Sequence, residues 1–91
     1  MYKIKKYSYD QAKKLNVSIK PSTNKNKKID VYKNNKKIAS IGDINYKDYP
    51  TYLNEKGKVF ADERKKLYKK RHEKDRSKIN TPGFYADKLL W

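Results

Sequence analysis

Apolar residues follow two spacings along this chain, an alternating one in the first half and a helical one in the second. Tyr2 and Ile4 alternate with lysines, and Val17 and Ile19 alternate again before Pro21. A period of two is typical of strands, and proline ends a strand because it has no N–H to donate. The pattern therefore predicts two short strands in this part of the chain.

The clearest local pattern is a hairpin over residues 28–41. Two short apolar runs within this segment flank Asn34-Asn35. Asparagine tolerates positive φ, so the pair suits a two-residue hairpin turn. Because a lone hairpin is marginal in water, one of the segments 2–4 and 17–19 is expected to add a third strand, with a helix covering one face.

A short helix is predicted between the first two alternating segments. Ser8 and Gln11 have the spacing of a capping box, in which the hydroxyl accepts from a free backbone N–H and the amide side chain reaches back. The helix is expected to run to about Leu15, and Asn16 can end it in the left-handed conformation.

The second half of the chain is predicted to be helical. Asp48 followed by Pro50 indicates a helix start, and Gly57 ends that short helix. Thr81 followed by Pro82 has the same form and predicts a last helix. This last helix is apolar almost all round, so it is expected to be buried.

Between these two helices, residues 59–78 are predicted to form one long basic helix. Nine of the 25 Lys and Arg residues of the chain lie between Arg64 and Lys78, against Glu73 and Asp75. A charge this dense must find an anionic partner or stay solvated. It is the strongest functional signal in the sequence, and it indicates a polyanion.

Steps of three and four predict which side of this helix faces the core. The residues on that side are Phe60, Arg64, Leu67 and Arg71, with Ala61 and Tyr68 beside them. Lys65, Lys66 and Lys69 are expected to point the other way, toward solvent or a ligand. Acidic residues four positions away neutralise only part of this charge.

Two groups of tyrosines have two interpretations each. Tyr46, Tyr49 and Tyr52 recur at every third position, and Tyr32 lies in the predicted hairpin. Exposed aromatic rings could stack on unpaired bases, whereas buried ones would pack in the core. Core packing is the preferred interpretation for both groups.

Trp91 also has two interpretations. It could anchor the last helix onto the long basic helix, or it could dock in another protein. The internal contact is preferred, because the core needs its large apolar residues. The polar segment 22–28 is either a solvated connection or a loop whose lysines reach phosphate groups.

Composition limits the size of the core. At 91 residues, 35% hydrophobic and 38% charged, the chain is expected to form a single small basic domain, residues 1–91. Residues 1–43 would hold the sheet and first helix, and residues 44–91 the helical half. The predicted fold class is α+β, with a small antiparallel sheet of two or three strands, including hairpin 28–41, packed with the helical C-terminal half.

Several functional classes are disfavoured. With no cysteine, the chain offers neither a disulfide framework nor a thiolate zinc site. His72 is the single histidine, and no nucleophile–base set or phosphate-cradling glycine loop is recognisable. We expect no enzyme activity, metal or cofactor. Residues 1–10 lack a continuous apolar core, so no signal peptide is expected, and no apolar run approaches the length of a membrane span.

The segment 28–41, the following KDYPTYL, the basic RKKLYKKRHEKDRSK and the ending TPGFYADKLLW together resemble a family of small basic proteins of uncharacterised function from large DNA viruses, including giant viruses. The resemblance covers roughly residues 7–91. It implies a viral source and a location in the virion or in the host cytoplasm or nucleus, without secretion. It implies no activity and no functional residues.

The net charge of +15 favours sequence-tolerant nucleic-acid binding, to DNA rather than RNA, through the phosphate backbone. The expected contacts on the long helix are Lys65, Lys66, Lys69, Lys70, Arg71 and Lys74. The expected contacts on the polar loop are Lys25, Lys27 and Lys28. The alternative is a small virion structural component, a minor capsid or core protein that bridges other proteins.

Overall fold

The computed structural model describes residues 2–91, which form an α+β fold as predicted. The elements in the first half are α1 (Lys6–Leu15), β1 (Ser18–Pro21), β2 (Lys27–Lys33) and β3 (Lys36–Asp43). Those in the second half are α2 (Tyr49–Lys56), α3 (Lys58–Arg71), α4 (Glu73–Arg76) and α5 (Pro82–Leu90). Within the described residues, the helices are too short and too polar to cross a membrane.

The strands form an antiparallel sheet in the order β1-β2-β3. Asn34 and Asn35 take φ values of 54° and 63° at the turn between β2 and β3, so the predicted hairpin is confirmed. The third strand comes from β1, which pairs Ile19 with Val31. The alternative third strand, residues 2–4, is irregular instead.

Residues 2–4 alternate between polar and apolar without forming a strand, and the side chains of Tyr2 and Ile4 have separate partners. The Tyr2 hydroxyl donates to Oδ2 of Asp48 at 2.6 Å, while Ile4 is buried in the core. The segment therefore joins the N-terminus to the start of α2 rather than to the sheet.

Helix α1 begins earlier than its capping pattern indicates. Its N-cap is Lys5, whose side chain makes no capping hydrogen bond. The Ser8 Oγ instead donates to the backbone oxygen of Leu89 at 2.7 Å, so the predicted capping box is wrong. Ser8 is fully buried and satisfies a free carbonyl at the end of α5. Asn16, with φ 60°, ends the helix as predicted.

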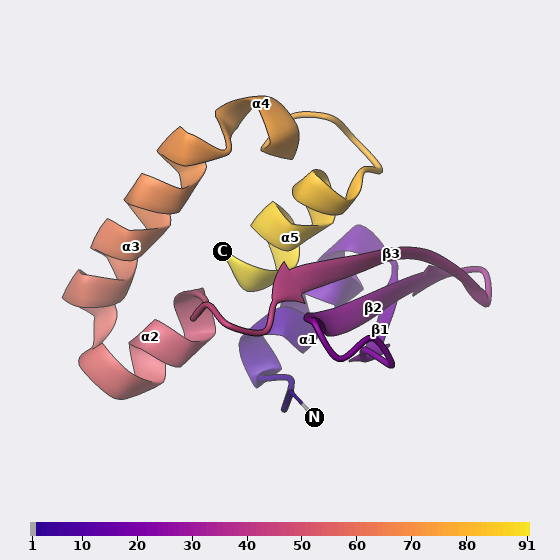
Figure 1. Ribbon diagram of the computed structural model, residues 1–91, viewed down its shortest axis with the longest axis horizontal. Helices are drawn as coiled ribbons and strands as arrows, with labels where there is room; N and C mark the ends of the chain where they lie inside the picture. The colour runs from indigo at the N-terminus through magenta and orange to yellow at the C-terminus, as the bar shows by residue number, and fades with distance from the viewer. Residues whose placement is uncertain (1) are drawn as a thin grey trace.

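The core lies between the sheet and helices α1 and α5 (Figure 1). Helix α5 is capped by Thr81, which accepts from the backbone N–H of Phe84, and Pro82 lies in its first turn, both as predicted. Its burial is also confirmed, since Leu89 and Leu90 are at most 1% exposed. The other core residues are Ile4, Ala12, Ile19, Ile29, Val31, Ala39, Ile41 and Tyr85.

Helices α2, α3 and α4 form an arc outside α5 (Figure 1). Asp48 caps α2 by accepting from the Thr51 N–H at 3.0 Å, with Pro50 in the first turn, as predicted. Gly57, with φ 87°, ends α2 and begins α3. The start and the end of α2 are therefore determined by residues close to them in sequence.

The predicted single helix over 59–78 is wrong, because α3 ends at Arg71 and the short α4 follows His72. His72 has φ −108° and ψ 20°, outside helical values. Arg76 Nε donates to the Lys69 carbonyl at 3.1 Å, which satisfies a group left free by the break. The break turns the chain back so that α4 contacts α5.

Candidate functional site

The inner side of α3 agrees with the predicted one in part. Ala61 is fully buried and Tyr68 half-buried, whereas Phe60 and Leu67 are 40% and 49% exposed. Of the residues predicted to face inward, Ala61 and Tyr68 are thus buried or half-buried, whereas Phe60 and Leu67 lie toward the outer edge of the helix. Helix α3 packs against α2, where the ring centroids of Phe60 and Tyr52 lie 5.4 Å apart.

Two of the predicted phosphate-contacting lysines consequently point inward. Lys69 Nζ donates to Asp87 Oδ1 at 2.6 Å, and Asp87 is 1% exposed. Lys65 Nζ lies 4.7 Å from the ring centroid of Tyr49. Burial lowers the pKa of Lys65, and the nearby Lys69 charge lowers it further. The expectation that Lys65 and Lys69 point outward is wrong.

Lys28 is also withdrawn from the surface. It is 4% exposed, and its Nζ lies 2.9 Å from Asp48 Oδ2 and donates to the backbone oxygen of Tyr46. Strand β2 begins at Lys27, one residue before Lys28, so the expected mobile loop is shorter. The expectation that Lys28 reaches phosphate is wrong. Lys25 is exposed in the β1–β2 turn, and Lys27 is half-buried.

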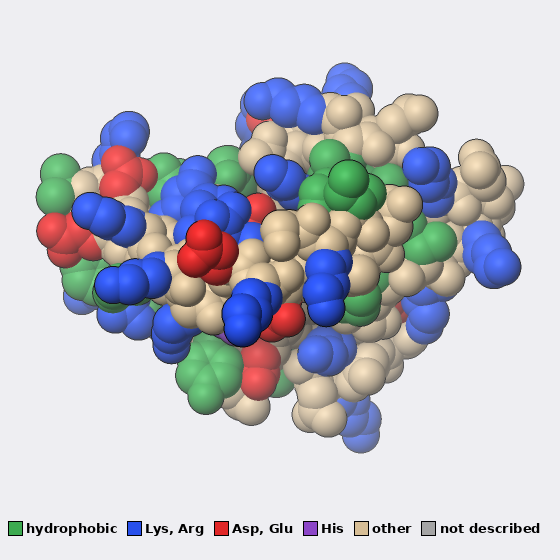
Figure 2. Space-filling view, turned by 90° about the horizontal axis from the view of Figure 1, so that it is seen from above, with side chains coloured by type: hydrophobic (Ala, Val, Ile, Leu, Met, Phe, Trp, Pro, Cys, Tyr) green, Lys and Arg blue, Asp and Glu red, His purple; other side chains and the backbone are tan. Residues whose placement is uncertain are grey.

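Four exposed cations near the end of α3 and in α4 are predicted contacts: Lys66, Lys70, Arg71 and Lys74. None of the four forms an ion pair with another described residue. Among the neighbouring acidic residues, Asp62 pairs with Lys58 at 2.6 Å and Asp75 lies 3.9 Å from His72, while Glu63 and Glu73 are exposed and form no ion pair with another described residue. Lys and Arg side chains are spread over the face shown in Figure 2, with fewer acidic ones between them. We call these four residues the outer basic face.

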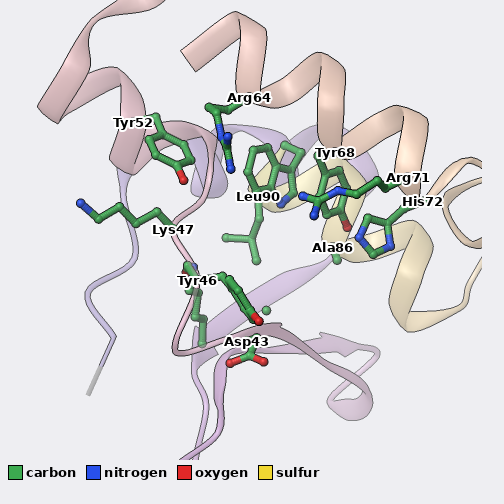
Figure 3. A pocket seen from close by; sticks show the side chains of 13 residues that line it. Asp43, Tyr46, Lys47, Tyr52, Arg64, Tyr68, Arg71, His72, Ala86 and Leu90 are labelled. Atoms are coloured by element: carbon green, nitrogen blue, oxygen red, sulfur yellow. The ribbon is translucent and has the colours of Figure 1, made fainter. Parts of the chain in front are cut away.

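Beside this face, a cleft of about 400 Å³ lies between α3, the end of α5 and the segment that joins β3 to α2 (Figure 3). Arg64, Tyr68, Arg71 and His72 reach it from α3, and Asp43 and Tyr46 from the opposite wall. The remaining lining residues are Lys28, Gly42, Lys47, Tyr52, Ala86, Leu90 and Trp91. We call it the aromatic cleft.

Stacked rings form one wall of the aromatic cleft. The rings of Tyr68 and Trp91 are nearly parallel, with centroids 4.4 Å apart and an interplanar angle of 8°. Tyr52 lies 6.2 Å from Trp91, and His72 stacks on Tyr68 at 4.4 Å. The predicted contact of Trp91 with the basic helix is confirmed. Burial, together with the charge of Asp87, raises the pKa of Tyr68 to about 12, so its phenol stays neutral at neutral pH.

The charged groups of the aromatic cleft are mostly positive. Arg64 and Arg71 form no ion pair with other described residues, and Arg64 lies 5.7 Å from the ring centroid of Tyr52. Lys47 is paired with Glu55 at 2.5 Å. Asp43 is the single acidic side chain in the lining. Two guanidinium groups are therefore available to an anion.

A second hollow of about 320 Å³ adjoins the aromatic cleft. The two share Gly42, Tyr68, His72 and Ala86 in their linings. Lys27 and Lys78 line the second hollow, together with the acidic Asp75. The structure thus brings Lys27, a predicted contact, to the same groove as the end of α3.

Two buried carboxylates near the sheet are occupied by internal partners. Burial would raise the pKa of Asp48, but hydrogen bonds from Thr51 and Tyr2 and the charge of Lys28 outweigh it and lower the pKa. Burial acts in the same way on Asp30, where hydrogen bonds from two serines, assisted by Lys37, lower the pKa. Both groups therefore serve the fold.

The predicted tyrosine stripe is divided. Tyr49 is buried, and its hydroxyl donates to Asp62 at 2.7 Å, which together with burial raises its pKa to about 12. Tyr52 is half-buried, and Tyr46 is 71% exposed at the mouth of the aromatic cleft. Core packing is thus confirmed for Tyr49 and wrong for Tyr46. Tyr32 is half-buried under Lys20, whose Nζ lies 5.4 Å from the ring centroid.

The aromatic cleft is the feature that sequence reasoning missed. Its aromatic residues come from α2, α3, the segment before α2 and the end of the chain, and no periodicity relates these segments. The α3 contribution follows steps of four, Arg64, Tyr68 and His72, which a helical pattern could have grouped. Among residues 2–91, no three His, Asp or Glu side chains come together as potential metal ligands.

A protein-family model, described as a family of unknown function (DUF5754), matches residues 17–59. The match covers the sheet and α2, less than half of the chain, and ends before most of α3. No curated protein and no solved structure matches the chain.

Proposed function

We propose that this protein binds nucleic acid with little sequence preference, DNA ahead of RNA, by contacting the phosphate backbone. The outer basic face carries the proposal: four exposed cations, close in sequence, that form no ion pair with another described residue. Like charges at this spacing repel one another, so binding a polyanion relieves a cost that the folded chain otherwise bears. The net charge of +15 adds long-range attraction.

The proposal predicts a defined salt dependence. Each phosphate neutralised on duplex DNA releases condensed counterions, so four contacts give a log–log slope of affinity against salt of about −3.6. Fluorescence anisotropy with labelled duplex DNA, single-stranded DNA, duplex RNA and heparin, across a salt series, measures this slope directly. Preference for DNA over heparin at matched charge would support a dedicated face.

A matched pair of variants locates the contact. One removes three charges from the outer basic face (Lys66→Gln, Lys70→Gln and Lys74→Gln). The other removes three exposed, unpaired charges elsewhere (Lys13→Gln, Lys14→Gln and Lys33→Gln). Both lower the net charge equally, so the first should reduce the salt slope by nearly 3 and the second by much less. Equal effects, or binding to every polyanion that vanishes near physiological salt, would refute the proposed face.

An exposed apolar group supports a second candidate, a small structural component that bridges other proteins. Val59, Phe60 and Leu67 lie on α3 with exposed fractions of 79%, 40% and 49%. Such residues together on one helix are typical of protein contacts. Because the sequence resembles proteins of large DNA viruses, we propose that either function is carried out in a virion or in the host cytoplasm or nucleus.

Cosedimentation with purified capsid at high salt distinguishes the two candidates. A structural component would stay bound in stoichiometric amount at a salt concentration that removes it from DNA, because apolar contacts are not screened. Phe60→Ser with Leu67→Ser should then release it from capsid. If these substitutions leave capsid association unchanged, this apolar group is not the contact.

A further inference from the structure

We propose that the aromatic cleft binds one unpaired nucleotide of a single-stranded nucleic acid, with its base against the aromatic wall and its phosphate at the guanidinium groups. The proposal rests on the proposed function and adds a ligand class and a second site to it. The proposal goes beyond contact with the phosphate backbone, because the base must be unpaired and unstacked to enter the cleft.

The size of the cleft suits this ligand. Its volume is about 400 Å³, within the range of small-molecule sites and large enough for a base with its sugar and phosphate. Stacked base pairs in a duplex present only their edges, so a ring-lined cleft can be filled only by an unpaired base. The cleft therefore favours single strands.

The lining provides both interactions that single-strand binding uses. Tyr46 is 71% exposed and offers a free aromatic ring, on which the π-face of any base can stack, while Tyr52 and Trp91 add aromatic surface to the lining. Arg64 and Arg71 offer planar forks that match a phosphate bidentately. An acidic peptide would satisfy the arginines and leave most of the aromatic surface without a partner.

The cleft is continuous with the proposed backbone site. Arg71 belongs to both, since it lines the cleft and is part of the outer basic face. On the other side, Lys27 and Lys78 line the adjoining hollow, where a neighbouring phosphate can be held. A strand can thus place one nucleotide in the cleft and its flanking phosphates on cations.

Trp91 makes the proposal measurable, since it is the single tryptophan of the chain and lines the cleft. The probes are a short thymidine oligonucleotide and an abasic oligonucleotide of the same length, which carries the same phosphates without bases. We expect the thymidine oligonucleotide to change the Trp91 fluorescence and to bind roughly tenfold more tightly than the abasic one.

Tyr46→Ala tests the cleft itself, because Tyr46 is 71% exposed and its removal should leave the fold intact. Tyr9→Ala is the matched control, a 50% exposed tyrosine on α1 outside the cleft lining. We expect Tyr46→Ala to weaken binding of the thymidine oligonucleotide roughly five- to tenfold and leave abasic binding unchanged. Tyr9→Ala should change neither.

Equal affinity for the two oligonucleotides, with no effect of Tyr46→Ala, would overturn the cleft proposal while leaving backbone binding in place. Polyglutamate that displaces the thymidine oligonucleotide and gives the same Trp91 response would also overturn it, in favour of an acidic protein segment. Failure of the proposed function looks different, because then neither oligonucleotide binds near physiological salt.

Discussion

The ammonium of Lys69 donates to one carboxylate oxygen of Asp87 at 2.6 Å, while the other oxygen of Asp87 is buried with no hydrogen bond. Asp87 is 1% exposed, and Lys69 is its nearer cation, with Lys88 farther away at 3.8 Å. A lysine of the basic helix thus holds α5 against α3. This contact separates lysines that stabilise the fold from lysines that are free for a ligand.

Replacing Lys69 should therefore cost stability rather than affinity. Lys69→Gln leaves a buried carboxylate without its cation, and we expect the free energy of unfolding to fall by about 2–4 kcal/mol. Lys70→Gln, one residue along and exposed, should change it by less than about 0.5 kcal/mol. Urea denaturation followed by Trp91 fluorescence measures both. Equal stability of the two variants would show that the Lys69–Asp87 pair contributes nothing net.

The stack of Trp91 on Tyr68 should stabilise the contact between the end of the chain and α3. Trp91→Ala removes a partly buried ring, and we expect a loss of roughly 2–3 kcal/mol. Trp91→Phe keeps a ring at the same place and should lose about half as much. Because both variants lack tryptophan, far-UV circular dichroism must follow the unfolding. A negligible loss in Trp91→Ala would mean that the ring serves a ligand and not the fold.

Gly42 and Gly57 form a matched pair for backbone substitution. Both have positive φ, +80° and +87°, which side chains rarely adopt. A Cβ at Gly42 would lie 2.6 Å from Leu90 Cδ1, whereas one at Gly57 meets nothing within 4 Å. We expect Gly57→Ala to cost about 1–3 kcal/mol from strain alone, and Gly42→Ala a further 1–3 kcal/mol from the clash.

Thermal unfolding of these two alanine variants measures the difference. Equal melting temperatures would show that Leu90 moves aside without cost, and that the part of the aromatic cleft lined by Gly42 and Leu90 is deformable. A lower melting temperature for Gly42→Ala would show that this part of the cleft is rigid.

Stability should fall in acid because Asp30 is ionised and hydrogen-bonded in the folded chain. Its pKa is lowered from the ordinary 3.8, so the stabilisation is complete above that value and is lost as the pH falls through the folded pKa. The amide side chain of the Asp30→Asn variant cannot ionise. The loss in free energy of unfolding relative to the wild type should therefore be largest near neutral pH and shrink below about pH 4. The pKa of Asp48 is also lowered in the folded chain, so the Asp30→Asn variant should still lose some stability in acid.

Urea denaturation at a series of pH values from neutral to about 2 gives both curves. A constant difference between wild type and Asp30→Asn across this range would contradict ionisation as the source of the stabilisation. A difference that grows in acid would reverse the sign of the pKa shift.

Much of the fold could be predicted from the sequence. The hairpin with its Asn34-Asn35 turn, the cap at Asp48 and the cap at Thr81 all depend on interactions within a few residues. The capping box at Ser8 failed because a buried hydroxyl found a partner 81 residues away, at Leu89. Local patterns do not contain such a contact.

The candidate site was predicted only in part. Lys66, Lys70, Arg71 and Lys74 are exposed as expected, whereas Lys28, Lys65 and Lys69 are turned inward. Which lysines turn inward depends on where buried carboxylates and rings lie in other elements. The charge run itself gave no indication of this.

The sequence by itself thus determined the α+β class, the turn residues and the positive charge, because these follow from local backbone preferences and from composition. Tertiary structure decided the orientation of α3 and the aromatic cleft. Helix α3 buries Ala61 and pairs Lys69 with Asp87 of α5, and the turn at His72 returns the chain so that Trp91 meets Tyr68. Packing contacts between distant segments decided these features, and they have no periodic signature in the chain.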